Sequence, residues 1–269
     1  MRIAISHATT YRYDGALVHA VQALRLTPPI GPGQAVLSWR ITAPGMDTAA
    51  SYTDAFGNLV QVVASRGGGE TFQVVANGVV ETTDTGGVAG RTGEAATPAV
   101  YRRATPASTP SAAITALARE VAAPDRLSTL HALMGAVHGR VAYVVDATTQ
   151  QTTAAAAFAD GRGVCQDHAH IMIAAARALG MPARYVTGYL LLEGDEAEAS
   201  VAHHAWAEAW VEELGWVGFD AANCLCPTDR YVRLAVGLDA ASAAPIRGVR
   251  RGTGAEHLCV DVAVRLAGQ

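Results

Sequence analysis

The pattern of secondary structure changes part-way along the chain, and this change restricts the fold more than any other feature of the sequence. The first ninety or so residues contain short runs of β-forming residues, at 36–41, 59–63 and 71–75, separated by turns rich in glycine and proline. Helical patterns begin only after residue 110. The sequence therefore predicts an α+β protein in which an N-terminal antiparallel β-sandwich precedes a second domain that contains helices.

A linker is expected between the two domains. Residues 83–110 are rich in glycine, threonine, alanine and proline, and two helices follow, capped by Ser111 and Asp125. A length of 269 residues, of which 50% are hydrophobic, is sufficient for two domains that each have a core. The expected division is a sandwich domain over residues 1–95, a linker over 96–110 and a second domain over 111–269.

The charged residues exclude several classes of protein. All 20 basic residues are arginines, and the 24 acidic residues give a net charge of −4, so we expect no nucleic-acid partner. The sequence contains no lysine, which rules out a Schiff-base lysine and a phosphate-binding Walker lysine. It also contains no stretch of about 18 or more apolar residues, so we expect no membrane partner.

The cysteines and the N-terminus favour a cytoplasmic location. Four cysteines are too few for a disulfide-rich secreted fold of this length. Residues 1–7 lack the unbroken apolar stretch of a signal peptide. The expected compartment is therefore a reducing one.

A cysteine is predicted at the start of a helix. From Cys165 to Leu179 the apolar residues follow one another at intervals of four, three, four and three, which places them on one buried helical face. Gly180 and Pro182 then end the helix. The helix dipole and the free backbone N–H groups at such an N-terminus favour the reactive thiolate. By itself, this position fits a small buried cysteine at the start of a packed helix equally well.

A histidine on a predicted strand is the candidate base. The segment 201–210 alternates small residues with larger polar or aromatic ones, which places His204 on one face of a strand. The other residues on that face are Trp206, Glu208 and Trp210. If a hairpin follows, Asp220 returns beside His204, whereas a tighter turn brings Asn223 there. Both residues are candidates for the group that orients the imidazole.

Ordered motifs along the chain resemble the bacterial transglutaminase-like family. In the second half they are GVCQD at 163–167, RALGMPARYV at 177–186, HAWAE at 204–208 and GWVGFD at 215–220. In the first half, HATTYRY at 7–13, LRLTP at 24–28 and DAFGN at 54–58 are similar to the N-terminal domain found with these proteins. The resemblance covers nearly the whole chain, and three catalytic motifs in the family's order are highly specific.

The resemblance implies a papain-like catalytic core, in which the cysteine helix packs on an antiparallel sheet. It implies that Cys165 is the nucleophile, His204 the base and Asp220 the residue that orients the imidazole. The family often has Pro-Thr after the aspartate, whereas Ala221 and Ala222 follow it here, so the loop after Asp220 departs from the pattern. No acidic cluster resembles the calcium sites of animal transglutaminases, and no cofactor or metal is expected.

The implied activity is thiol-dependent acyl transfer on peptide or side-chain amides. Hydrolysis is preferred to crosslinking, because bulk water needs no second binding site. The expected partner is a peptide or protein substrate. Three residues near the catalytic motifs are candidates for contacting it: Trp206, Gln166 and His168.

Two other functions are alternatives. A metal-dependent hydrolase could draw on Cys165 and on the histidines at 168, 170, 203 and 204. However, histidines two apart on a helix or adjacent on a strand point in different directions, which argues against shared coordination. The second alternative is a non-catalytic peptide-binding module, which the apparently complete set of Cys165, His204 and Asp220 argues against.

Overall fold

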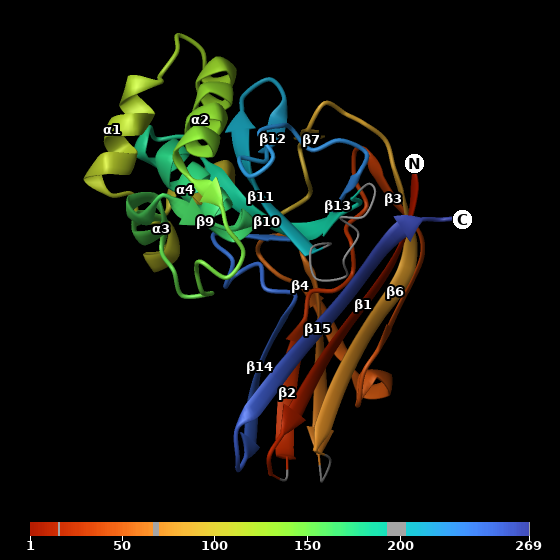
Figure 1. The fold of residues 1–269 in the computed structure, drawn as a ribbon. Coiled ribbons are helices and arrows are strands. Elements are labelled where there is room, and N and C mark those ends of the chain that lie inside the picture. Colours follow the sequence, from red (N-terminus) through yellow and green to blue (C-terminus); the bar gives the residue numbers. More distant parts are fainter. Residues whose placement is uncertain (16, 67–69, 193–202, 269) are drawn as a thin grey trace.

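The computed structural model describes residues 1–15, 17–66, 70–192 and 203–268. Figure 1 shows two parts: long strands that form an elongated sandwich, and a second sheet at one end of it that carries the helices. The α+β class expected from the sequence is confirmed. None of the helices in these described ranges is long and apolar enough to cross a membrane.

The sandwich consists of two four-stranded antiparallel sheets. One has the order β15 (Glu256–Leu266), β1 (Arg2–Tyr13), β6 (Thr71–Thr82), β3 (Gln34–Thr42). The other has the order β14 (Ile246–Gly252), β2 (Leu17–Leu24), β5 (Leu59–Arg66), β4 (Ala50–Thr53). Alternate residues of the inner strands, including Ile3, Ile5 and Leu24, are buried between the two sheets, as the two-residue period of a strand requires.

The last two strands of the chain differ from expectation. The division by sequence placed residues 246–266 in the second domain, but β15 pairs with β1 and β14 pairs with β2 along almost their whole lengths. The sandwich is therefore completed by the C-terminal end of the chain. Local sequence patterns do not contain this information, because the partner strands lie more than two hundred residues away in the sequence.

The second sheet supports the helices. Its strand order is β13 (Tyr231–Gly237), β10 (Ala183–Leu190), β11 (His203–Val211), β12 (Gly215–Phe219), β7 (Val88–Gly90). The helices are α1 (Ala112–Glu120), α2 (Arg126–Arg140), α3 (Ala154–Asp160) and α4 (Cys165–Ala178). The predicted caps are present, since Ser111 and Asp125 accept from the backbone N–H groups of Ile114 and Ser128.

The central helix, α4, is buried on every side rather than along one stripe. Its residues from Asp167 to Arg177 are all buried, because β11 and β10 lie on one side and the other three helices cover the rest. The helix ends as the sequence predicts: Gly180 has a positive φ of 74°, and the N–H of Met181 bonds the carbonyl of Ala176.

The expected linker is an ordered part of the core. Residues 96–110 form two short 3-10 helices, η2 (Pro98–Arg102) and η3 (Pro106–Ser108), and Tyr101 is fully buried. The buried guanidinium of Arg177 donates to the Tyr101 carbonyl (2.8 Å) and to Ser108 Oγ (2.6 Å). The composition of a flexible linker was misleading here, because hydrogen bonds from one buried arginine hold the segment in place.

The pairing of the C-terminal strand predicts a specific stability difference. Val262 on β15 is 2% exposed in the sandwich core, whereas Val260 on the same strand is 46% exposed. Val262→Ala should lower the free energy of unfolding in urea by about 2 kcal/mol, through lost apolar burial and the cavity left behind. The matched variant Val260→Ala should change it by less than about 0.5 kcal/mol. Equal effects would contradict the placement of β15.

Candidate active site

Cys165 is the first residue of α4, and the chain that leads into this helix is held by Asp167. The Asp167 carboxylate accepts from the backbone N–H of Val164 (2.9 Å) and from Thr148 Oγ1 (2.6 Å). A Cβ atom on Gly163 would lie 2.6 Å from the Cβ of Asp167, so only glycine fits there. The motif GVCQD thus fixes the position of Cys165, which is half-buried at the helix N-terminus.

His204 and Asp220 form a buried pair. His204 lies near the start of β11, and Asp220 follows the last residue of β12. The two side chains approach to 2.6 Å between Nε2 and Oδ2, and His204 is 5% exposed and Asp220 1%. Of the two candidates that the hairpin left open, Asp220 is therefore the one that bonds the imidazole. A hydrogen bond is worth more in this buried environment than in water.

Three further groups hold the Asp220 carboxylate. The Tyr231 hydroxyl donates to Oδ2 (2.7 Å), Asn223 Nδ2 donates to the same oxygen (2.8 Å), and the N–H of Ala222 donates to Oδ1 (3.0 Å). Asn223, the alternative orienting residue, lies 3.5 Å from Nε2 of His204 and so acts mainly through Asp220. Sequence analysis missed Tyr231, the first residue of β13, which has no local pattern that marks it as a partner of Asp220.

The electrostatics of the site favour a charged imidazole. Burial by itself lowers the pKa of His204, but hydrogen bonds with Asp220 and Cys165, and the negative charges of both, outweigh it and raise the pKa to about 10. For the carboxylate the effect of burial has the opposite sign, and it raises the pKa of Asp220. The hydrogen bonds from His204, Tyr231 and Asn223 and the charge of His204 outweigh burial and bring this pKa below its usual value. The structure thus brings Cys165, His204 and Asp220 together.

The neighbouring histidine, His203, has the opposite character. Its side chain lies on the other face of β11, where Nε2 is 3.0 Å from Thr187 Oγ1. Burial, with a smaller contribution from the charge of His204, lowers the pKa of His203 to about 4. Its ring also lies 6.1 Å from the ring of His7 on β1, whose pKa burial lowers to about 3. These two rings are therefore neutral at pH 7.

Tyr143 is a second residue that sequence analysis missed. It lies in β8 (Ala142–Tyr143), which pairs in parallel with β9 (Arg162–Gly163) just before Cys165. The backbone N–H of Cys165 donates a hydrogen bond to the Tyr143 phenol, which by itself lowers the pKa of the phenol. Burial and the charges of Cys165 and Asp220 outweigh this bond and raise the pKa of Tyr143 to about 12. The side chain is about half exposed, and its phenol lies next to Cys165.

The three expected substrate-contacting residues have different positions. Gln166 follows Cys165 in the first turn of α4 and is half-buried. Trp206 is 3% exposed, and its ring is stacked 6.4 Å from that of His204. His168 is 1% exposed, and its two ring nitrogens lie 2.9 Å from the carbonyls of Val164 and Val141. The expectation for His168 is wrong, because its ring is enclosed and bonded to the backbone.

The residues considered as metal ligands do not converge. Besides His168 and His203, which bond the protein as described above, His170 accepts from the N–H of Ala240 (3.0 Å). Across the part of the chain that the structure describes, no group of three or more histidine, cysteine or acidic side chains is arranged to hold a metal ion. Among the residues that the structure describes, these side chains therefore do not form a shared coordination sphere.

Comparisons with known proteins agree with this geometry. Residues 115–221 match the family model of the transglutaminase-like superfamily, and residues 3–81 match that of the bacterial transglutaminase-like N-terminal region. Together the two matches span most of the chain.

Full-length relatives are similar along the whole chain. An uncharacterized protein of Mycobacterium leprae (strain TN) is 29% identical over 279 residues, covering 99% of each chain. One from Mycobacterium tuberculosis (strain H37Rv) is 28% identical over 290 residues, covering 98% of this chain and 91% of its own. A crystal structure from Cytophaga hutchinsonii, described as "a Putative Cysteine Protease", superposes with a TM-score of 0.73 at 21% identity, covering 98% of each chain, and so has the same fold.

The buried neutral histidines predict how stability depends on pH. Because burial lowers the pKa of His203 and of His170 to about 4 and that of His7 to about 3, the unfolded chain binds more protons than the folded one below the usual value of about 6.5. The free energy of unfolding should therefore fall between pH 6.5 and 4.5, by roughly 2 kcal/mol for each of the three rings.

The control is His203→Gln, which retains a hydrogen-bonding group for Thr187 but cannot titrate. Its urea unfolding measured over the same range should show a shallower fall than the wild-type protein. A slope unchanged by the substitution would contradict the buried, neutral state of His203.

Proposed function

Since the chain belongs to the transglutaminase-like superfamily, we propose that it is a thiol-dependent acyl transferase that acts on peptide or side-chain amides, with hydrolysis as its main reaction. The observation that carries the proposal is the assembly of Cys165 at a helix N-terminus with the buried pair of His204 and Asp220. A nucleophile, a base and a group that orients the base are the parts that this chemistry needs.

The proposed reaction begins with proton transfer from Cys165 to His204. Nε2 of the imidazole is bound to Asp220, so Nδ1 is the nitrogen left for the thiol. The thiolate sulfur then forms a bond with the carbonyl carbon of the amide, and the C–N bond breaks as the imidazolium gives its proton to the departing amine. Asp220 stabilises the imidazolium, and its own bonds from Tyr231 and Asn223 keep it in place.

The thioester is then resolved by a second nucleophile. His204 removes a proton from water, the oxygen attacks the thioester carbonyl, and the carboxylic acid leaves as Cys165 is regenerated. An amine in the place of water would give transamidation. The sequence has no lysine, so lysine side chains of this chain cannot be the acceptor, and an amine would have to come from another molecule.

The oxyanion of the tetrahedral intermediate needs hydrogen-bond donors. We assign the backbone N–H of Cys165 as one donor and the Tyr143 hydroxyl, with which it is hydrogen-bonded, as the other. Both groups lie beside the thiol, and a carbonyl oxygen that enters between them would accept from both. The half-exposed position of Tyr143 supports this role, because the substrate must reach it from solvent.

Gln166 is the residue we propose for direct contact with the substrate, since it follows the nucleophile and remains half-buried. Trp206 is more enclosed, and we propose that its ring supports the imidazole of His204 from the side. The exposed thiols of Cys224 and Cys259 support a reducing compartment, and we propose that the enzyme acts in the cytoplasm.

The nucleophile is tested with a pair of cysteine variants. Cys165→Ala should lower amide hydrolysis, followed by ammonia or amine release from peptide amides, by at least about 10³-fold and abolish inactivation by iodoacetamide. Cys259→Ala removes an exposed thiol on β15 and should leave both properties unchanged. Hydrolysis that survives in Cys165→Ala would overturn the mechanism. If a metal chelator abolishes the activity and alkylation of the thiol does not, the metal-dependent hydrolase is favoured. If intact-mass measurements detect no thioester on the protein, the non-catalytic peptide-binding module is favoured.

The role of Tyr143 is tested by removing only its hydroxyl. Tyr143→Phe should lower kcat on the order of 10²-fold with little change in KM, because the donor acts on the developing oxyanion and not on the bound amide. Tyr52→Phe, at a similarly exposed tyrosine of the sandwich, is the control. An unchanged or increased kcat in Tyr143→Phe would show that the hydroxyl is not an oxyanion donor.

A further inference from the structure

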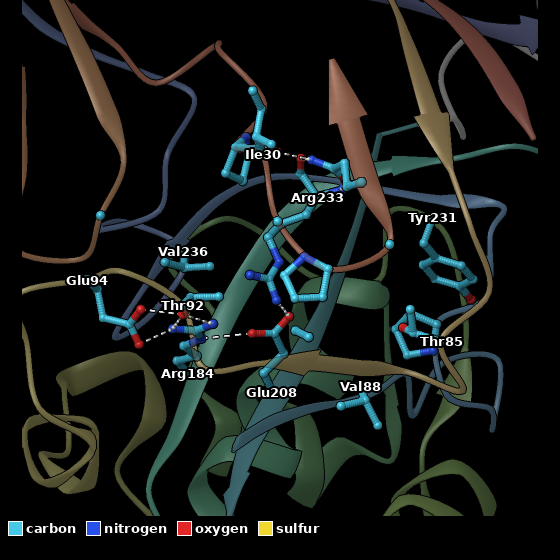
Figure 2. Close-up of a pocket in the computed structure, with 18 of the residues that line it drawn as sticks. Ile30, Thr85, Val88, Thr92, Glu94, Arg184, Glu208, Tyr231, Arg233 and Val236 are labelled. Atoms are coloured by element: carbon cyan, nitrogen blue, oxygen red, sulfur yellow. Dashed lines mark hydrogen bonds and ion pairs between the residues drawn. The ribbon is translucent and has the colours of Figure 1, made fainter. Parts of the chain in front are cut away.

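A cavity of about 440 Å³ lies between the sandwich loops and the second sheet, on the face of that sheet opposite α4 (Figure 2). Its walls come from the loop segments 29–34, 53–58 and 83–94 and from strands β10, β11 and β13. This volume is within the range of sites for small molecules, and interfaces between domains are a common place for them. Cys165 and Asp220 are not among its lining residues.

The floor of the cavity is an ionic network in which two arginines pair with two glutamates, and a third arginine also lines the cavity. Three arginines and two glutamates line the cavity: Arg91, Arg184, Arg233, Glu94 and Glu208. Glu208 receives Nε of Arg184 on one oxygen (2.8 Å) and Nη2 of Arg233 on the other. Glu94 receives Nη1 of Arg184 (2.9 Å) and Nε1 of Trp216 (2.6 Å) on one oxygen, and the Thr92 hydroxyl on the other. Both carboxylates are therefore already fully engaged.

Arg233 is the cation with unused donors. Its Nη2 bonds Glu208, and its other guanidinium nitrogens have no hydrogen-bond partner within the described ranges. The side chain is only 15% exposed. Burial lowers the pKa of Arg233, the nearby Glu208 raises it, and the charge of Arg184 lowers it further, with a net decrease. Arg233 contacts one carboxylate, Glu208, with a single nitrogen, so its remaining donors are available for a charge-assisted bond to a bound anion.

The wall around this cation includes a set of apolar side chains among polar ones. Ile30, Val88 and Val236 line the cavity together with the rings of Trp206 and Tyr231. A small inorganic anion would leave this surface uncovered. The shape and chemistry therefore match an anion attached to an apolar group.

We propose that this cavity is a second binding site, which takes a carboxylate attached to an apolar group, with the carboxylate on Arg233 and the apolar group against Ile30, Val88 and Val236. The C-terminal residue of a peptide and a free aliphatic acid share this chemistry. The proposal concerns binding alone and does not depend on the reaction at Cys165.

The occupant of this site would lie against residues that also hold the candidate catalytic pair. The ring of Tyr231 lines the cavity while its hydroxyl donates to Oδ2 of Asp220 (2.7 Å). Trp206 lines the cavity and stacks beside His204. A ligand bound in the cavity would therefore contact Trp206 and Tyr231, and these two side chains contact His204 and Asp220.

The test measures binding by isothermal titration calorimetry to Cys165→Ala, in which no amide can be turned over by the thiol. N-acetyl-leucine should bind at least about tenfold more tightly than N-acetyl-leucinamide, since the amide cannot form a charge-assisted bond with Arg233. Binding of 3-methylbutanoate as well would identify free acids as ligands, and its failure to bind would identify the peptide end. Equal affinities for acid and amide, or no binding of N-acetyl-leucine at millimolar concentration, would overturn the proposal.

A matched pair of substitutions locates the binding in the cavity. Ile30 at the cavity mouth is 78% exposed and Val249 on β14 is 72% exposed, so neither change should affect folding. In the Cys165→Ala background, Ile30→Glu should weaken binding of N-acetyl-leucine about tenfold or more through charge repulsion, and Val249→Glu should not. Arg233→Gln, checked for folding by circular dichroism, should abolish the preference for acid over amide. Unchanged affinity in Ile30→Glu would place the ligand elsewhere and contradict the proposal.

Discussion

The structure of the candidate site depends on the burial of α4 from Asp167 to Arg177. A helix enclosed by a sheet and three other helices cannot shift or fray, so the residue at its N-terminus is fixed relative to the sheet. Buried charges hold both of its ends: Asp167 accepts from the backbone at the first turn, and Arg177 donates to backbone carbonyls at the last. These signs agree with the helix dipole, which favours an anion at the N-terminus and a cation at the C-terminus.

The two faces of β11 carry different kinds of side chain, one packed in the core and the other part of the candidate site. The face toward α4 carries Ala205, Ala207 and Ala209, whose small side chains allow the helix to approach closely. The opposite face carries His204, Trp206 and Glu208, which need space and polar partners. Gly188 provides part of that space, because a Cβ there would lie 2.8 Å from the ring of Trp206. Alternation along one strand therefore separates the tightly packed core around α4 from the face that carries the candidate site.

Much of the site could be predicted from the sequence, because its determinants are local. Cys165 at a helix start is fixed by GVCQD and by Gly180, and His204 and Asp220 are on successive strands of one hairpin-like unit. The residues that were missed act across large separations. Tyr143 reaches the site through the pairing of two-residue strands, and β15 completes the sandwich from the far end of the chain. Such contacts have no local pattern in the sequence. The same holds for Arg177, whose hydrogen bonds hold residues 96–110 in the core although their composition is that of a linker.

The N-terminal sandwich contacts the strand that carries His204. His7 on β1 bonds the hydroxyl of Tyr189 on β10 (2.8 Å), and its ring lies beside that of His203, the residue before His204. On the other face, Glu94 bonds Arg184, which in turn bonds Glu208, two residues after Trp206. The strand that carries His204 is thus bordered on both faces by polar contacts, one set with the sandwich and one with the segment that follows it. A displacement of the sandwich would therefore alter the environment of His204 through His7 and His203.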